Sequence, residues 1–255
     1  MKYGLIGEKL SHSYSKIIHE KLADYTYDLC PLTKKEFPVF MEQREFSAIN
    51  VTIPYKCDVI PYLESMDESA AAIGAVNTIV NRNGKLYGYN TDLPGFIYMA
   101  EKNGISMEGK KVVVLGNGGA AQAIKAGIKK LGAASMIVVG HRVMKEGVIT
   151  YEECFEKHAD ADIIVNTSPV GMYPASDASP VDLTRFPQCE AVLDIIYNPL
   201  TTKLVAQARE LGMTGVTGLE MLVAQAKYAV EIFLDTKLDE RVIDDIYREL
   251  AAQLS

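Results

Sequence analysis

Short apolar runs and longer amphipathic stretches alternate along most of the chain. The apolar runs have the length of buried strands and cover residues 3–7, 48–53, 110–116, 135–140, 161–166, 191–196 and 213–216. Stretches with apolar residues at helical spacing cover 19–25, 92–103, 118–132, 201–212, 218–234 and 239–254. Strands that alternate with helices are typical of βαβ units and a largely parallel sheet. We therefore expect an α/β protein.

Turn signals divide the remaining segments. Two β-rich runs within 75–90 flank Asn83-Gly84, a dipeptide that favours a tight hairpin turn. Gly104 stands where the helix that begins near Asp92 would end. Residues 169–190 are rich in Pro, Ser and Asp and predict a surface loop near the strand ends. Because ligands in open α/β sheets bind at such ends, this loop is a functional candidate.

Composition narrows the class of protein. The 255 residues suffice for one large or two smaller domains, and 48% of them are hydrophobic. A formal net charge of −7 without a basic run argues against nucleic-acid binding. No apolar stretch approaches the ~20 residues of a membrane span, and no signal-peptide pattern opens the chain. We expect a cytoplasmic protein that acts on a small molecule and binds neither membrane nor nucleic acid.

The positions of the cysteines and histidines argue against a disulfide framework and against a metal site. The four cysteines are far apart and form no CxxC pair; they are Cys30, Cys57, Cys154 and Cys189. This spacing predicts that the cysteines are reduced thiols and do not form a disulfide framework. The four histidines lack metal-ligand spacing, so we expect no metal site.

A glycine-rich turn joins the apolar run 110–116 to the helical pattern 118–132. Gly116, Gly118 and Ala121 have G-x-G-x-x-A spacing. The first glycine permits a tight turn, and the second lets the backbone approach a pyrophosphate. The free amides at the start of the helix would favour the phosphates. This context predicts dinucleotide binding; the alternative is a turn that only packs closely.

The end of the next apolar run bears on which dinucleotide is bound. An NAD site usually has an acidic side chain there, on the ribose 2′-hydroxyl. This run ends in Gly140, His141 and Arg142, and the guanidinium of Arg142 could pair with a 2′-phosphate. We therefore favour NADP, with NAD possible; the alternative is that Arg142 is an ordinary surface arginine.

Polar residues interrupt the apolar runs at three places before residue 93. NVTIPYK holds Asn50, Thr52 and Lys56, GAVNT holds Asn77, and GYNTD ends in Asp92. A lysine beside a carboxylate is a suitable proton-transfer pair for carbonyl–alcohol interconversion. The alternatives are a surface lysine and an aspartate that caps the following helix.

A set of motifs, taken in order, resembles one known family. SHSYS, NVTIPYK, GAVNT, GYNTD, GNGGAA, VNTSPVGM, YNPLTT and GLEMLVAQA closely resemble the shikimate dehydrogenases, from residue 4 to about 230. The resemblance implies reversible NADP-dependent reduction of 3-dehydroshikimate to shikimate, in aromatic amino-acid (chorismate) biosynthesis. It also implies an N-terminal α/β substrate domain with a mostly parallel sheet, completed by C-terminal helices, and a Rossmann-like NADP-binding domain. The implied segments are 1–92 for the substrate, 93–218 for the dinucleotide and 219–255 for the returning helices.

The resemblance also implies roles for individual residues. Lys56 would move the proton at the reacting oxygen, while Asp92 would orient the substrate hydroxyl and support the lysine electrostatically. The implied substrate ligands are Ser13, Ser15, Asn50, Thr52, Asn77, Tyr197 and Gln225. The implied cofactor contacts are Gly116, Asn117, Gly118, Gly119, Ala120, His141, Arg142, Asn166, Thr167, Met172 and Gly218.

Some of these residues also have a plain structural interpretation. Ser13 and Ser15 resemble the family's hydroxyl pair that holds the substrate carboxylate, but the serine cluster alone favours a helix N-cap. Gln225 could be a polar residue on an apolar helix face, and Tyr197 a core or rim aromatic.

The chain departs from the family pattern in two motifs. Lys16 stands where a proline usually follows the second serine. The usual Asn-Arg-Thr reads His-Arg-Val at 141–143, and Glu146 replaces the family's second arginine. NADP preference therefore depends largely on Arg142, and weakened cofactor selectivity stays open.

Other functions are compatible with the same motifs. A related enzyme would act on quinate, although two compact serines favour shikimate. A non-catalytic ring-acid sensor would keep the fold without turnover, and a plain nucleotide-binding module would leave the polar clusters before residue 93 unexplained. The chain is expected to be a monomer or a homodimer.

Overall fold

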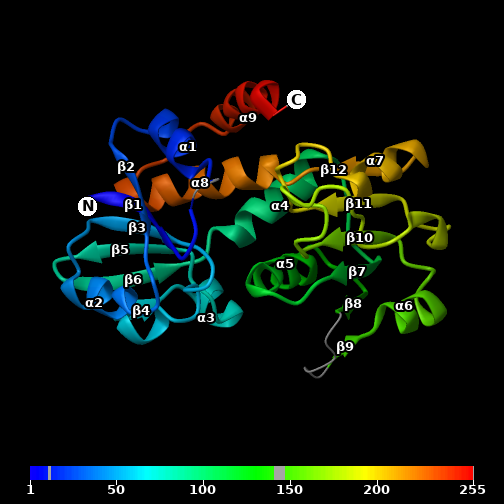
Figure 1. Ribbon diagram of the computed structural model, residues 1–255, viewed down its shortest axis with the longest axis horizontal. Helices are drawn as coiled ribbons and strands as arrows, with labels where there is room; N and C mark the ends of the chain where they lie inside the picture. The colour runs from blue at the N-terminus through cyan, green and yellow to red at the C-terminus, as the bar shows by residue number, and fades with distance from the viewer. Residues whose placement is uncertain (11–12, 141–146, 255) are drawn as a thin grey trace. The chain divides into compact units, whose positions relative to one another are not determined.

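A computed structural model describes residues 1–10, 13–140 and 147–254 (Figure 1). The chain forms two compact units. Unit 1 comprises Met1–Pro94 and Val223–Ile246, and unit 2 comprises Gly95–Leu222 and the residues from Tyr247 onward. Each unit contains its own six-stranded sheet. The assignment of one segment to the substrate and another to the dinucleotide stays a prediction.

The sheet of unit 1 is mixed. Its strands are β1 (Tyr3–Gly7), β2 (Tyr27–Pro31), β3 (Ala48–Val51), β4 (Ser65–Met66), β5 (Thr78–Arg82) and β6 (Lys85–Tyr89), in the order β2-β1-β3-β5-β6-β4. β1 is parallel to β2 and β3, and β4 is parallel to β6. β5 runs antiparallel to β3 and β6. Three short helices intervene along the chain: α1 (Ser15–Leu22), α2 (Glu36–Gln43) and α3 (Glu68–Ile73).

The turn between β5 and β6 confirms the predicted hairpin. Asn83 and Gly84 both have positive φ, 54° and 85°. This pair of angles belongs to the two-residue turn whose twist matches that of the strands. The hairpin brings Thr78, at the start of β5, opposite Tyr89, at the end of β6. The chain on either side of the hairpin, near residues 77 and 91, is therefore held side by side.

The sheet of unit 2 is entirely parallel. Its strands are β7 (Lys111–Leu115), β8 (Ser135–Val139), β9 (Val148–Ile149), β10 (Ile163–Asn166), β11 (Ala191–Asp194) and β12 (Thr214–Val216). Their order is β12-β11-β10-β7-β8-β9. Numbered within the unit and read from the other edge, this is 3-2-1-4-5-6, the order of dinucleotide-binding sheets. The order reverses between β7 and β10, where such sheets bind their ligand.

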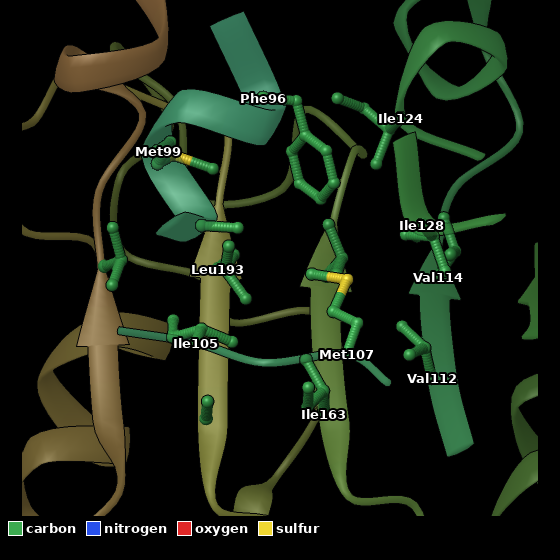
Figure 2. Close-up of a cluster of buried hydrophobic side chains, with 14 of the residues drawn as sticks. Phe96, Met99, Ile105, Met107, Val112, Val114, Ile124, Ile128, Ile163 and Leu193 are labelled. Carbon is green, nitrogen blue, oxygen red and sulfur yellow. The ribbon is translucent and has the colours of Figure 1, made fainter. Parts of the chain in front are cut away.

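Both faces of this sheet are buried. Val112 and Val114 of β7 belong to one apolar cluster, while Val113 and Leu115 belong to another. Figure 2 shows the first cluster, in which side chains of α4 (Asp92–Lys102) and α5 (Gly119–Lys130) pack against the strands. Burial on both faces explains why these strands appear in the sequence as continuous apolar runs.

Except for α6 (Tyr151–Lys157), the helices of unit 2 and the C-terminal helices follow the predicted segments closely. The structure has α7 (Lys203–Glu210), α8 (Leu219–Leu234) and α9 (Arg241–Leu254). Within 169–190 it shows a short 3-10 turn, η2 (Leu183–Arg185), so the predicted loop is confirmed. α6 has no counterpart in the prediction.

The prediction is least accurate between residues 8 and 74. The helix predicted at 19–25 is α1, which begins at Ser15 and ends at Leu22, so its last three residues are wrong. Ala23 adopts extended backbone, which stops the helix there. The strands β2 and β4 and the helices α2 and α3 have no predicted counterpart. They are short, and an edge strand such as β2 shows no clean alternation of buried and exposed residues.

Candidate active site

Lys56 and Asp92 form a shielded ion pair in unit 1. Nζ of Lys56 lies 2.5 Å from Oδ2 of Asp92, and the two side chains are 13% and 12% exposed. Neighbouring Tyr55 is buried, and its hydroxyl donates to the carbonyl of Leu32 at 2.6 Å rather than to either member of the pair. A charge pair in this environment interacts more strongly than one in bulk water.

Asn90, not Asp92, caps helix α4. Oδ1 of Asn90 accepts the N–H groups of Asp92 and Leu93 at 3.1 and 3.3 Å. The Nδ2 group of Asn90 donates to the carbonyl of Ala75 at 2.9 Å, which holds the amide in place. The carboxylate of Asp92, in the first turn of the helix, is thereby available for Lys56. The helix dipole also favours a negative charge at this position.

Asn77 orients the carboxylate of Asp92. Its Nδ2 group donates to Oδ1 of Asp92 and to Oγ1 of Thr91, both at 3.0 Å. Its Oδ1 atom accepts the N–H of Thr91 at 2.8 Å. Thr91 Oγ1 lies 3.4 Å from Oε1 of Gln225 on α8, so the returning helix joins this cluster. Oδ1 of Asn77 also accepts the hydroxyl of Thr78 at 2.9 Å, so the amide is occupied by protein contacts, and its predicted contact with a substrate hydroxyl stays a prediction.

Asn50 lies next to Asn77 and is buried. Its Nδ2 group donates to the carbonyl of Asn77 at 3.2 Å and to Oγ1 of Thr78 at 3.0 Å. Its Oδ1 atom accepts the hydroxyl of Tyr27 at 2.7 Å. Asn50 is therefore occupied by protein contacts, and its predicted role as a substrate ligand stays a prediction.

Ser13 and Ser15 flank Tyr14, the N-cap of α1, and Thr52 follows β3. Oγ of Ser13 accepts the N–H of Ser15 at 3.2 Å, but the N-cap position itself has no side-chain cap bond, so a serine N-cap is not what the structure shows. Ser15 is the first residue of α1 and is buried. The methyl group of Thr52 would lie 2.5 Å from a Cβ on Gly7, so only glycine leaves room for it. Contact of these hydroxyls with a substrate stays a prediction.

The glycine-rich turn of unit 2 has the backbone that its pattern predicts. Gly116 has φ +101°, which strains any other residue, and a Cβ there would lie 2.9 Å from the N atom of Ser168. At Gly118 and Gly119 an added Cβ would meet open space. The N-terminal amides of α5 are thus approachable by a pyrophosphate, and the turn fits a dinucleotide. Asn117 is oriented by Lys125, whose Nζ donates to its Oδ1 at 2.9 Å.

Asn166 and Thr167 lie at the end of β10, beside this turn. Thr167 Oγ1 donates to the carbonyl of Leu115, the last residue of β7, at 2.9 Å. Asn166 is buried and donates through Nδ2 to Asp194 Oδ1 at 3.0 Å. Oδ1 of Asn166 accepts both the N–H and the hydroxyl of Ser168. These bonds bring the predicted cofactor contacts Asn166 and Thr167 to the point where the strand order reverses.

Asp194 is a residue that the sequence prediction missed. It is fully buried at the end of β11 and also accepts the hydroxyl of Thr202 at 2.7 Å and the N–H of Ile196 at 3.1 Å. Burial raises the pKa of its carboxyl to about 6. The sequence signal for this residue was a single carboxylate within the apolar run 191–196. A buried carboxylate usually has polar side chains as hydrogen-bond partners.

The remaining predicted residues of unit 2 lie in three loops and at the start of α5. A Cβ on Gly218 would lie 2.1 Å from the carbonyl oxygen of Ile195, so this crossing of backbones requires glycine. Met172 is 46% exposed, and Tyr197 is partly buried after β11. Ala120 lies in the first turn of α5. His141 and Arg142, on which the NADP preference depends, lie outside the described residues.

A metal site was not expected, and the described residues contain no group of three or more His, Cys, Asp or Glu that could hold a metal ion. The Lys56–Asp92 pair and the glycine turn are the two features that the sequence singled out for chemistry and binding. The first lies wholly in unit 1 and the second wholly in unit 2.

Comparison with known proteins identifies one family. The family model described as the shikimate dehydrogenase substrate binding domain matches residues 5–79. The shikimate dehydrogenase (NADP(+)) of Clostridium beijerinckii is 40% identical, over 96% of this chain and 96% of that protein.

Solved structures give the same result. Shikimate dehydrogenase 1 from Peptoclostridium difficile matches with a TM-score of 0.90 and 36% identity, over 100% of this chain and 99% of that one. The Thermus thermophilus shikimate 5-dehydrogenase in complex with NADP(H) and shikimate matches at 0.86 and 27% identity, over 98% and 99%. The Listeria monocytogenes enzyme in complex with shikimate and NAD matches at 0.82 and 26%, over 96% of each chain. On its full-length relatives, its fold and the order of its motifs, this chain belongs to the shikimate dehydrogenase family.

Proposed function

We propose that this chain catalyses the reversible NADP-dependent interconversion of shikimate and 3-dehydroshikimate. The observation that carries the proposal is the ion pair of Lys56 and Asp92, 2.5 Å apart and shielded from most of the solvent. A pair of this kind can move a proton to and from an alcohol oxygen. The proposal agrees with the names of the relatives, which describe NADP(+) and shikimate for those proteins.

Lys56 is the proton carrier in this mechanism. In the oxidation of shikimate the neutral amine takes the proton from the reacting hydroxyl, while a hydride leaves the carbon that bears it and a carbonyl forms. Bound NADP supplies the hydride acceptor. In the reverse direction the ammonium returns the proton to the carbonyl oxygen. The carboxylate of Asp92 stabilises the ammonium form and is itself oriented by Asn77.

The other predicted ligands hold the substrate in place. Ser13 and Ser15, at the start of α1, would donate hydroxyls to the substrate carboxylate, which the helix N-terminus also favours. Thr52, Asn77 and Gln225 would contact the ring hydroxyls. In this scheme unit 1 binds the substrate and the glycine turn of unit 2 binds the dinucleotide.

The choice between NADP and NAD depends on Arg142 and is part of the proposal. The Clostridium beijerinckii relative is named for NADP(+), whereas the Listeria monocytogenes structure contains NAD. We expect this chain to prefer NADP and to accept NAD more weakly, because one guanidinium remains to pair with the 2′-phosphate.

A cytoplasmic location completes the proposal. The four cysteines are free thiols, which suits a reducing compartment. Among the described helices none has the length and apolar character needed to cross a membrane.

Initial rates with shikimate or quinate, each with NADP or NAD, test the proposal. We expect shikimate with NADP to give the highest kcat/KM of the four combinations. Faster turnover of quinate would transfer the proposal to a quinate dehydrogenase. Binding of shikimate without any change in NADPH absorbance would instead support a ring-acid sensor and contradict catalysis.

A further inference from the structure

A buried tyrosine hydroxyl lies at the start of a hydrogen-bond chain that leads to the active-site pair. Tyr27 on β2 donates its hydroxyl to Oδ1 of Asn50 at 2.7 Å. Asn50 donates through Nδ2 to Oγ1 of Thr78 at 3.0 Å. Tyr27 and Thr78 are fully buried, and Asn50 is 5% exposed. Nothing in the predicted substrate or cofactor set includes Tyr27 or Thr78.

The chain continues in the same direction as far as the carboxylate. Thr78 donates its hydroxyl to Oδ1 of Asn77 at 2.9 Å, and Asn77 donates through Nδ2 to Oδ1 of Asp92 at 3.0 Å. Lys56 then donates to Oδ2 of Asp92. All donors therefore point toward Asp92, and hydrogen bonds aligned in this way strengthen one another.

The first member of the chain supports its direction. The hydroxyl of Tyr27 donates to Oδ1 of Asn50, so the oxygen of that amide faces β2, while its NH₂ group faces Thr78 and the carbonyl of Asn77. Burial raises the pKa of Tyr27 well above its usual value, so the phenol keeps the proton that it donates. Without this hydroxyl, Oδ1 of Asn50 would lose this donor, and the contacts of the NH₂ group would have to hold the amide in its orientation.

Tyr27 is itself held from three sides. Glu20 on α1 accepts its N–H at 3.0 Å, and Lys16 on the same helix donates to its carbonyl at 2.8 Å. Lys16 and Glu20 also pair with each other at 2.6 Å. The ring of Tyr27 stacks on buried His19, with the ring centroids 4.0 Å apart. Lys16, which replaces the usual proline, therefore ties α1 to the residue that begins the chain.

We propose that Tyr27 is a positioning residue for the Lys56–Asp92 pair, acting through Asn50, Thr78 and Asn77. It does not touch the substrate; together with the N–H of Thr91, the chain that it begins holds the Asn77 amide with its NH₂ group on the carboxylate of Asp92. The same residue joins α1, which begins with Ser15, to this chain. The inference rests on the proposed dehydrogenase activity and adds to it a remote residue that sets the geometry of proton transfer.

The test breaks the chain at two links. Tyr27→Phe and Thr78→Val each remove one hydroxyl and keep the shape of the side chain. We expect each to lower kcat for shikimate oxidation about five- to tenfold, the equivalent of one buried hydrogen bond, with a smaller change in KM. Either substitution interrupts the same chain. The kcat of the double variant should therefore lie within about twofold of the kcat of the slower single variant.

Tyr55→Phe is the matched control. Tyr55 is equally buried and its hydroxyl also donates a buried hydrogen bond, but to the carbonyl of Leu32 rather than to the chain. We expect it to lower the melting temperature about as much as Tyr27→Phe does, while kcat stays within about twofold of the parent.

Amide hydrogen exchange provides a measurement that needs no turnover. The N–H of Thr91 donates to Oδ1 of Asn77, so it reports whether the Asn77 amide keeps its orientation. Exchange at Thr91 should accelerate in Tyr27→Phe and not in Tyr55→Phe.

The outcomes separate the two proposals. An unchanged kcat in Tyr27→Phe, an equal loss in Tyr55→Phe, or single-variant losses that multiply in the double variant would each overturn the positioning role. No shikimate turnover by the parent chain would overturn the proposed function instead. In that case unchanged exchange at Thr91 in Tyr27→Phe would refute the chain as well, and faster exchange would support it as a structural connection.

Discussion

Exposure distinguishes two lysine–carboxylate pairs of similar geometry in unit 1. Lys85 and Glu64 lie 2.9 Å apart, but their side chains are 59% and 49% exposed. Such surface pairs contribute about 0–1 kcal/mol because water and salt screen them. Lys56 and Asp92 are mostly shielded, so water and salt screen their attraction less. The same residue types thus form a screened surface contact in one place and a shielded pair, which we propose to be catalytic, in the other.

Lys56→Ala should abolish proton transfer without abolishing substrate binding. We expect kcat to fall by about 10²–10⁴, the usual contribution of a general acid–base group, with a modest change in KM. Steady-state kinetics with shikimate and NADP measures both constants. Lys85→Ala removes an equally long side chain from an exposed pair and should leave kcat within about twofold. Near-parental turnover in Lys56→Ala would show that another group carries the proton.

Asp194 should make the stability of the protein fall as the pH rises through its titration. Its folded-state pKa is raised from 3.8 to about 6 by burial, so the folded state binds a proton more tightly than the unfolded state. Between these values the free energy of unfolding therefore decreases with pH, by about 3 kcal/mol in total.

Urea unfolding of the parent and of Asp194→Asn between pH 4 and 7 isolates this contribution. Asparagine resembles the protonated carboxyl and does not titrate, so the parent should lose stability relative to the variant as the pH rises to about 6. A constant difference between the two proteins across this range would show that Asp194 titrates normally.

At the scale of elements, the burial pattern of a strand or helix decides how well the sequence predicts it. β7, β10 and β11 have both faces covered, so each appears as a mostly apolar run without alternation. β2 has only Tyr27 buried and α2 is eight residues long, so neither stands out from its surroundings. The prediction succeeds where periodicity repeats over many residues and fails where tertiary contacts alone hold a short element.

The residues of the candidate site also differ in how far the sequence predicts their contacts. Lys56 and Asp92 could be paired from residue type and from resemblance, and the structure brings them together. The chain from Tyr27 through Thr78 could not be predicted, because it depends on the register of β1 with β2 and of β3 with β5. Single residues in different strands give no local signal of such contacts.

Glu231 should hold together the end of α8 and the turn that follows. Its side chain, 5% exposed, lies 2.8 Å from Nζ of Lys227, and it accepts the N–H of Leu238 at 2.8 Å. Removing one partner of a buried pair leaves the other charge unpaired. Glu231→Ala should therefore destabilise the protein by about 3–5 kcal/mol.

A second variant distinguishes the contribution of the charge pair to stability from that of side-chain packing. Lys227→Met combined with Glu231→Leu removes both charges and should recover most of the stability, as measured by urea unfolding. If the double variant were as unstable as Glu231→Ala, the contact with Leu238 rather than the charge pair would be the source of the stabilisation.

At the scale of the whole molecule, two sheets of different kinds suit the two different ligands of the proposed reaction. The mixed sheet of unit 1 brings polar side chains of distant segments into one buried cluster, which suits recognition of a small polar ring. The parallel sheet of unit 2 has its reversal of strand order at a glycine turn, which suits a dinucleotide. The net charge of −7 is compatible with both ligands, because hydroxyl groups and helix amides supply the local anion contacts.

The central claim is that the Lys56–Asp92 pair catalyses NADP-dependent oxidation of shikimate. The most direct measurement is the rise in NADPH absorbance when purified protein is mixed with shikimate and NADP, for the parent and for Asp92→Asn side by side. We predict a steady rise with the parent and a rate at least about 100-fold lower with the variant. No rise with the parent, or equal rates for the two proteins, would contradict the account.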